Sequence, residues 1–375
     1  MYVHVPFCAS RCGYCDFNTY TAPELGDSGA LAAFAETAIV ELRLARQVLG
    51  DAELPASTVF FGGGTPTLLP ASDLGRVLAA VDGEFGLAAD AEVTAEANPE
   101  SVDSAYLDRL RREGFTRISF GMQSARPHVL ALLERRHLPG RPEQCVSEAR
   151  EAGFDSVSLD LIYGTPGESV EDWRASLEAA VAAEPDHLSA YALVVEEGTR
   201  LAARVRRGEL ARPDDDDLAD KYLLADQVLG AAGYRWYEVS NWAPEGAAAC
   251  RHNLGYWRGD DWWGIGPGAH SHVGGTRWWN VKHPSTYAAR LLDGGSPALA
   301  REVLTADDRR LERILLGLRL REGLPLAELS DVGAKAAAQA LADGLLDATA
   351  YDRQLAVLTL PGRLLADAVV RDLVD

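Results

Sequence analysis

The sequence has no long apolar run and carries a deficit of basic side chains. No apolar stretch approaches the ~20 residues that a membrane-spanning helix requires, so we expect no membrane span, although transient association with a membrane stays open. No signal peptide precedes the first apolar segment, which favours a cytoplasmic protein. The 36 Lys and Arg residues face 56 Asp and Glu residues, and this net charge of −20 argues against nucleic acid as a partner.

Cysteine is also scarce, and its distribution does not suggest a disulfide framework. Three of the five cysteines, Cys8, Cys12 and Cys15, lie within eight residues, directly after the apolar run 2–7. Three thiolates can hold three irons of a cubane cluster and leave the fourth iron open for chemistry, whereas electron-transfer clusters typically use four cysteines. A zinc knuckle would need a fourth nearby ligand, and the near candidate, His4, lies on the predicted strand. The spacing therefore favours an iron–sulfur cluster.

The first half of the chain alternates between strand-like and helical patterns. Six strand–helix repeats with short connections predict an α/β fold with parallel strands and right-handed crossovers. The predicted strands cover 2–7, 58–61, 91–96, 117–123, 156–162 and 187–194, and the helices cover 30–49, 72–84 with Ser72 as N-cap, 103–113, two stretches within 126–152, and 169–183.

Chemistry collects at the carboxyl ends of parallel strands, and polar or glycine residues follow five of these six strands. The glycines 62–64 exceed what a turn needs, and they favour close approach of a ligand to bare backbone. They do not form a Walker A loop, because no Lys follows at the required position. Glu96 and Gln123 lie at strand ends, and Asp160 lies within an apolar run, where a lone carboxylate requires a partner or a ligand.

The pattern changes after residue 195. Residues 236–279 contain seven of the eight tryptophans together with several histidines. An aromatic, glycine-lined pocket with histidines would suit a large flat ligand with a metal at its centre, and core packing explains the same composition equally well. The acidic run 213–217 is typical of a solvated helix N-terminus, followed by a helix over 215–231 and a strand over 234–240.

The tail from residue 301 is mostly helical. Amphipathic patterns predict helices over 311–320, 327–346 and 363–374, with a short hairpin over 348–360 that would give the tail a winged-helix-like form. The tail has 10 basic and 13 acidic residues, the wrong balance for binding DNA, so a lid or docking module is favoured. The expected domains are 1–195, 196–300 and 301–375.

Taken together, these motifs resemble the radical S-adenosylmethionine (SAM) superfamily. The order and content are similar to the anaerobic coproporphyrinogen III oxidase (dehydrogenase) family, and within it to the HemW-type heme chaperones. The motifs that carry the resemblance are Tyr2-x-His4-x-Pro6-Phe7-Cys8-x3-Cys12-x2-Cys15, Gly62-Gly-Gly-Thr-Pro66, the strand-end acids, Cys15-Asp-Phe-Asn18 and His252-Asn253-x-x-Tyr256-Trp257.

The resemblance implies a partial (β/α)6 TIM-like barrel with one [4Fe-4S] cluster bound by the three clustered cysteines. SAM would chelate the open iron, and its reductive cleavage would give a 5′-deoxyadenosyl radical, which requires an electron donor for the cluster. The cofactor carries that chemistry and the protein positions it. The implied SAM-site residues are Tyr2, Gly63, Gly64, Thr65, Glu96, Gln123, Arg135 and Asp160.

Two branches of the family remain as alternatives. The dehydrogenases carry a further cysteine two positions after the third cluster ligand, where this chain has Phe17, and they have a segment ahead of the first strand. The chaperone branch implies heme bound near His252, Asn253, Tyr256 and Trp257, with His252 as the iron ligand. Its implied partners are heme and heme-accepting respiratory proteins, and the protein would be a monomer or a dimer.

Overall fold

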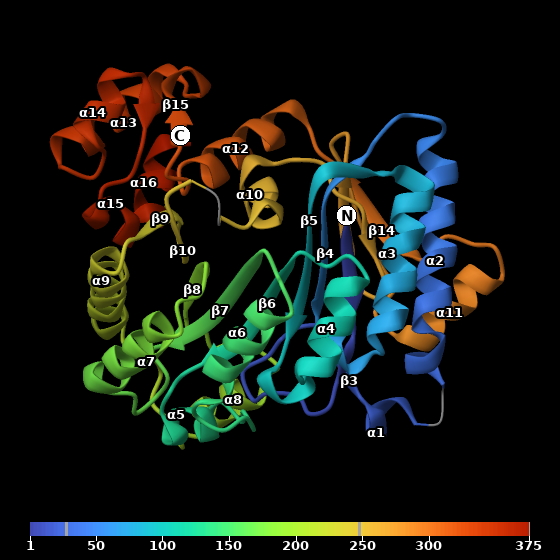
Figure 1. Cartoon of the computed structure of the whole chain (residues 1–375). Helices are drawn as coiled ribbons and strands as arrows, with labels where there is room; N and C mark the ends of the chain where they lie inside the picture. Colours follow the sequence, from blue (N-terminus) through green and yellow to red (C-terminus); the bar gives the residue numbers. More distant parts are fainter. Residues whose placement is uncertain (27–28, 247–248, 375) are drawn as a thin grey trace.

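The computed structural model describes residues 1–26, 29–246 and 249–374, and its centre is a curved nine-stranded sheet (Figure 1). The six predicted strands are all present, and each pairs in parallel with its neighbour, which confirms the α/β fold. They are β1 (Tyr2–Val5), β4 (Ala56–Gly63), β5 (Leu87–Ala97), β6 (Arg117–Gln123), β7 (Ser156–Tyr163) and β8 (His187–Ala192).

Helices cover the outer face of this sheet (Figure 1). Apolar side chains from alternate strand positions and from the helices form one continuous core, because successive residues of a strand point to opposite faces. The polar residues of the strands consequently face the inside of the curved sheet. The helices are α2 (Ala30–Leu49), α3 (Ala71–Phe85), α4 (Ser104–Arg112), α5 (Pro127–Leu132), α6 (Arg141–Glu151), α7 (Val170–Ala182) and α9 (Asp215–Ala231).

The helix starts follow the expected capping chemistry at most positions. Ser169 and Asp214 cap α7 and α9, so the acidic run lies at a helix N-terminus as predicted. The assignment of Ser72 as a cap is wrong, since α3 begins one residue earlier, after Pro70. Pro70 supplies the required extended backbone, and its carbonyl accepts from Asp73 and Leu74.

The segment 196–300 extends the same sheet at both edges. Strand β11 (Gly264–Ile265) pairs in parallel with β1, while β10 (Asn241–Pro244) pairs antiparallel with β8 and is followed in the sheet by β9 (Tyr234–Glu238). Strands β12 (His270–Val273), β13 (Thr276–Asn280) and β14 (Ala298–Val303) form a separate small sheet. The three domain boundaries stay a prediction.

The tail forms a helical module with its own apolar core. It contains α12 (Ala306–Gly317), α13 (Asp331–Ala342), α14 (Ala348–Asp352), α15 (Leu360–Leu364) and α16 (Ala366–Leu373). The predicted hairpin over 348–360 is wrong, because Asp347 caps a helix there. Strand β16 (Leu355–Ala356) pairs instead with the distant β15 (Leu324–Pro325).

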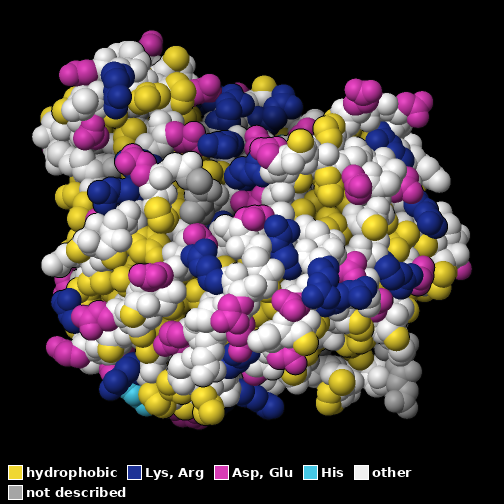
Figure 2. Space-filling view, viewed as in Figure 1, with side chains coloured by type: hydrophobic (Ala, Val, Ile, Leu, Met, Phe, Trp, Pro, Cys, Tyr) yellow, Lys and Arg dark blue, Asp and Glu magenta, His cyan; other side chains and the backbone are white. Residues whose placement is uncertain are grey.

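Charged side chains of both signs are interspersed on the face of the molecule shown in Figure 2. Lys and Arg side chains lie beside Asp and Glu side chains there, and no single-sign patch dominates that face. Among the described residues, no helix combines the length and the apolar character needed to cross a membrane.

Candidate functional site

The three clustered cysteines lie at the carboxyl ends of the strands and line one cavity of about 580 Å³. Cys8 ends β2 (Phe7–Cys8), which pairs in parallel with β3 (Tyr20–Thr21), and this short ladder closes the cysteine loop at its base. All three thiols are free and half-buried. Burial raises the pKa of Cys8 and raises that of Cys15 to about 11, so metal ions must displace protons from these thiols when they bind.

The geometry around the loop fits a cluster better than a zinc knuckle. His4, the candidate fourth zinc ligand, uses both ring nitrogens elsewhere: Nδ1 lies 2.9 Å from Tyr2 Oη, and Nε2 lies 2.9 Å from Asn18 O. Within the described ranges, no three His, Cys, Asp or Glu side chains converge on a point where one metal ion would be bound. A cubane places a different iron at each cysteine and therefore does not require convergence on one point.

The glycine run after β4 is needed for the packing of the loop itself. A Cβ on Gly63, where φ is +104°, would come 2.5 Å from the His4 ring, and a Cβ on Gly64 would come 2.5 Å from Phe7 O. The peptide N–H groups are engaged within the protein, since Gly64 donates to Val5 O and Thr65 donates to Phe7 O. The backbone groups of the glycine run that remain for a ligand are therefore carbonyl oxygens, which can accept hydrogen bonds from an amine.

Two carboxyl groups line the cavity, one beside the glycine run and one on β7. Glu96 accepts a hydrogen bond from Gly63 N at 3.1 Å, and burial together with the charge of Asp160 raises the pKa of Glu96 to about 7. Asp160 accepts from Ser119 Oγ at 2.8 Å and from Ser189 Oγ at 2.7 Å, while burial raises its pKa. Asp160 thus has the partners that its apolar sequence context required, and the two carboxyl groups make this part of the cavity suited to a cationic or hydroxyl-bearing ligand.

Two residues near Arg135, which lines the cavity, have left-handed backbone. Gln123 (φ 62°) follows a β-bulge at the end of β6, and Glu134 (φ 58°) ends the turn after α5. Non-glycine residues rarely adopt this conformation, and they concentrate at functional sites. The guanidinium of Arg135 donates to Gly121 O at 2.8 Å, and its Nη1 lies 3.7 Å from Cys12 Sγ.

The fold therefore gathers the eight predicted SAM-site residues and the three cysteines around one cavity. They come from β1, β4, β5, β6, β7 and the turns that follow these strands. For most of these residues the common location follows from the parallel topology, since the carboxyl ends of all six strands meet at one side of the sheet. Tyr2 is the exception, because it begins β1 and its ring stacks on His252, with centroids 6.3 Å apart, toward the other end of the cavity. The individual roles in binding the cluster and SAM remain predictions.

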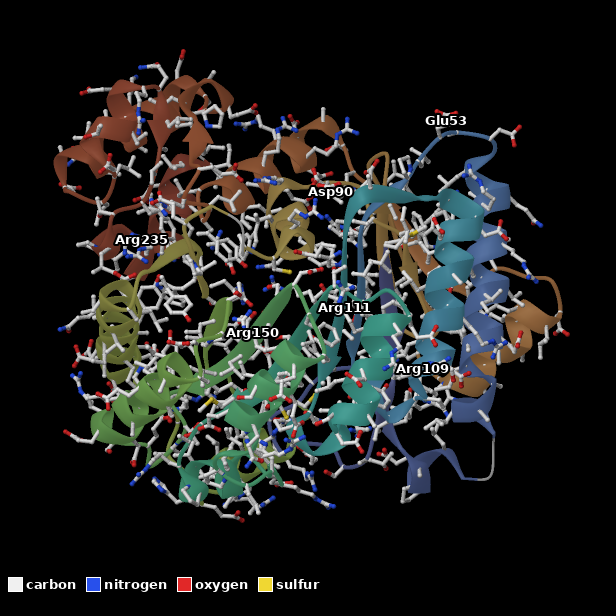
Figure 3. All side chains as sticks on the ribbon, in the orientation of Figure 1. Glu53, Asp90, Arg109, Arg111, Arg150 and Arg235 are labelled. Atoms are coloured by element: carbon white, nitrogen blue, oxygen red, sulfur yellow. The ribbon has the colours of Figure 1, made fainter. Side chains whose placement is uncertain are left out.

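The predicted heme motif lies at the opposite, amino-terminal end of the strands. Helix α10 (Arg251–Arg258) closes this end of the sheet, on the side away from α1 (Ala22–Leu25) and α5 (Figure 1). Glu92 of β5 accepts from the first backbone N–H groups of the helix, at 3.1 Å from Arg251 N and 3.0 Å from His252 N. Arg251 also pairs with Asp90 of β5 at 2.9 Å, and Asp90 is labelled near α10 in Figure 3.

His252 is buried between aromatic rings with both ring nitrogens occupied. Its Nδ1 lies 2.8 Å from Thr58 Oγ1, its Nε2 lies 2.9 Å from Tyr256 Oη, and it stacks on Phe60 with ring centroids 5.0 Å apart. Burial lowers the pKa of His252 well below the ordinary value, so the ring is neutral. Ligation of an iron by His252 would require one of these hydrogen bonds to break.

The other members of the heme motif have separate surroundings. Asn253 donates to Glu238 Oε1 at 3.0 Å, which ties α10 to β9. His252, Asn253 and Tyr256 line the far end of the same cavity, whereas Trp257 is not among its lining residues. The structure thus places three of the four predicted heme residues together.

Sequence reasoning missed several residues of this cavity. Thr94 precedes Glu96 at period-two spacing, and this alternation could have placed both on the inner face of β5. Arg117 and His187 also line the cavity from the amino-terminal ends of their strands. Nothing in the local sequence distinguishes Arg117 and His187 from ordinary polar residues at the start of a strand.

Comparison with known proteins places the chain in a family. Residues 2–180 match the model of the radical SAM superfamily, and residues 304–365 match that of the HemN C-terminal domain. The chain is 55% identical over 377 residues to the heme chaperone HemW of Mycobacterium tuberculosis (strain H37Rv), covering 100% of this chain and 94% of that protein. It is 37% identical over 346 residues to the heme chaperone HemW of Synechocystis, covering 91% and 82% of the two chains.

The solved structure of the coproporphyrinogen III oxidase HemN from Escherichia coli, described as a radical SAM enzyme, superposes with a TM-score of 0.83. The alignment covers 99% of this chain and 89% of that chain. At 24% identity, this likeness shows that the two proteins share a fold. Together with the full-length relatives, these comparisons show that the chain belongs to the radical SAM superfamily and, within it, to the HemW family.

Proposed function

We propose that this protein is a heme chaperone, which binds heme and transfers it to an acceptor protein. The observation that carries the proposal is the 55% identity over the whole chain to a protein named heme chaperone HemW. The position of Phe17 agrees with it, because the dehydrogenase branch is expected to carry a cysteine there. The expected acceptors are respiratory heme proteins.

Membership of the radical SAM superfamily implies a [4Fe-4S] cluster and SAM. Cys8, Cys12 and Cys15 would hold the cluster, whose open iron and reducing electron supply the chemistry of SAM cleavage when both groups are bound. In this chain, Glu96 and Asp160 would orient the ligand through its amine and hydroxyl groups. Ser119 and Ser189 hold the Asp160 carboxylate in place through hydrogen bonds.

The experiment that tests the function uses the full chain with its cluster reconstituted under anaerobic conditions. Heme is titrated in and followed by the Soret absorbance, and the loaded protein is then mixed with an apo heme protein to follow transfer. Saturable binding and transfer support the proposal. Failure of the full chain to bind heme overturns it.

A parallel incubation addresses the oxidase alternative. The reconstituted protein is supplied with coproporphyrinogen III, SAM and a reductant, and the products are separated by chromatography. A heme chaperone leaves the coproporphyrinogen unchanged. Formation of protoporphyrinogen would instead assign the protein to oxygen-independent porphyrin biosynthesis.

A further inference from the structure

The inner cavity has little room for a porphyrin beside the cofactors. Its volume is about 580 Å³, and the cluster and SAM of the superfamily belong in it. Pockets for a single drug-sized ligand already occupy about 300–1,000 Å³. The imidazole of His252 at the far end of this cavity is also engaged at both nitrogens. A heme site on the other side of the cysteine loop would avoid both constraints.

A second, larger cavity of about 940 Å³ lies on that other side. Cys12, Cys15 and Phe17 line both the inner cavity and this outer groove, so the cysteine loop forms the wall between them. A ligand in the outer groove would therefore lie against the cluster loop without displacing SAM.

Aromatic side chains are exposed along this wall. Phe17 is 60% exposed although it is a large apolar residue, and Tyr20 is half-buried with its ring edge-to-face against His283 at 5.3 Å. The neighbouring Asn18 fixes the loop by donating to Pro267 O and Lys282 O. The exposed Phe17 ring on an anchored loop suits contact with a flat apolar ligand.

The charge of the groove differs from that of the rest of the chain. Five cationic and four acidic side chains line it, whereas the whole chain has 36 basic and 56 acidic residues. Arg11 and Arg200 pair with Glu24 and Glu134.

Two of the remaining cations, Arg136 and Lys282, are exposed, and no ion pair is found for either among the described residues. The acids Asp16 and Glu197 also line the groove, so carboxylates of a ligand are expected to approach Arg136 or Lys282 rather than these acids.

We propose that heme binds in this outer groove, with its macrocycle against Phe17 and Tyr20 and its two propionates toward Arg136 and Lys282. The inference rests on the proposed function and assigns its heme site. Heme combines an apolar plane with two carboxylates, and the groove offers aromatic side chains and two exposed cations for these parts. In this arrangement the outer groove binds heme, and the inner cavity binds the cluster and SAM.

Heme titration of the reconstituted full chain tests the site through Phe17. Phe17→Asp places a charge beside the macrocycle, and we expect heme affinity to fall at least about tenfold, which corresponds to about 1.4 kcal/mol. Phe17→Leu keeps an apolar surface and serves as the matched control, with affinity near that of the native chain. Cluster absorbance and SAM binding are measured in both variants, because Phe17 also lines the inner cavity. A fall in heme affinity counts toward the outer groove when the cluster absorbance is that of the native chain.

A second pair of measurements tests the propionate contacts. The double variant Arg136→Gln/Lys282→Gln should weaken heme binding several-fold and leave binding of heme dimethyl ester unchanged, because the ester lacks the carboxylate charges. Val194→Asp, at the rim of the inner cavity, should leave heme binding unchanged.

Three results would overturn the outer-groove site. They are native-like heme affinity of Phe17→Asp, loss of affinity confined to Val194→Asp, and loss confined to His252→Ala. If the native chain does not bind heme at all, the result contradicts the proposed heme-chaperone function itself, and the proposed heme site with it.

Discussion

Arg135 Nη1 lies 3.7 Å from Cys12 Sγ, and this contact connects a half-buried permanent cation to one of the three loop thiols. The resemblance to radical SAM proteins implies that Arg135 contacts SAM. The structure shows the guanidinium directed at the cluster loop and at the Gly121 carbonyl. Hydrogen bonds to cluster sulfurs and local charge both set the reduction potential of an iron–sulfur centre.

Replacement of Arg135 by Gln should lower the midpoint potential of the reconstituted cluster. A nearby positive charge stabilises the reduced, more negative form, and we expect a shift on the order of 60 mV, a tenfold change in the one-electron equilibrium. Spectroelectrochemical titration without SAM measures it. Arg135→Lys keeps the charge and is the control. An unchanged potential combined with weaker SAM binding would instead assign Arg135 to SAM alone.

Replacement of Gly64 by Ala should impair assembly of the cluster. The added Cβ would meet Phe7 O at 2.5 Å, and the backbone next to Cys8 would have to move. We expect the iron content after reconstitution to fall severalfold, as measured by iron assay and absorbance.

Gly83 provides the control for this substitution. It lies within α3, and a Cβ there meets nothing within 4 Å. Gly83→Ala should keep full iron loading and should stabilise the fold by roughly 0.5–1 kcal/mol. Equal loading of Gly64→Ala would contradict the packing role of the glycine run.

The buried Glu96 carboxyl predicts a pH dependence of stability. Its pKa is raised from 4.5 to about 7, so the folded chain binds this proton more tightly than the unfolded chain does. The resulting stabilisation is present below pH 4.5 and is lost as the pH rises through 7. Compared with native protein, Glu96→Gln should therefore gain relative stability across this window, by roughly 3 kcal/mol at most.

Denaturant unfolding of the apo chain at pH 5, 6, 7 and 8 measures this difference. Glu178→Gln, on an exposed position of α7, controls for the loss of one charge. A difference that stays constant from pH 5 to 8 would show that Glu96 does not titrate there.

His252→Ala should weaken the anchoring of α10. The substitution removes hydrogen bonds with Thr58 and Tyr256 and the stacking on Phe60, and a loss of about 2–4 kcal/mol in unfolding free energy is expected. Chemical denaturation measures the loss. His252→Gln, which can keep part of the hydrogen bonding, should recover some of it, whereas equal stability of His252→Ala and native protein would contradict the anchoring role.

The sequence by itself determined the strand–helix order and the cluster loop. Period-two and helical patterns reflect burial on one face of each element, and this local physics placed the six parallel strands and most helices within a few residues. The spacing of Cys8, Cys12 and Cys15, the position of Glu96 near the end of its strand and the position of Asp160 within its strand could also be read from the sequence. The Ser72 cap and the 348–360 hairpin were wrong, because the helices in these two segments begin directly after Pro70 and Asp347.

Only the tertiary structure decided what surrounds each of these residues. His252 lies at the end of the strands opposite the cysteines, and its hydrogen bonds come from β4 and from its own helix, a relationship between segments almost 200 residues apart. The glycine run is constrained by His4 and Phe7 across the neighbouring strand. Phe17 is exposed on a wall shared by two cavities. Such contacts depend on how distant elements pack, and no local pattern encodes them.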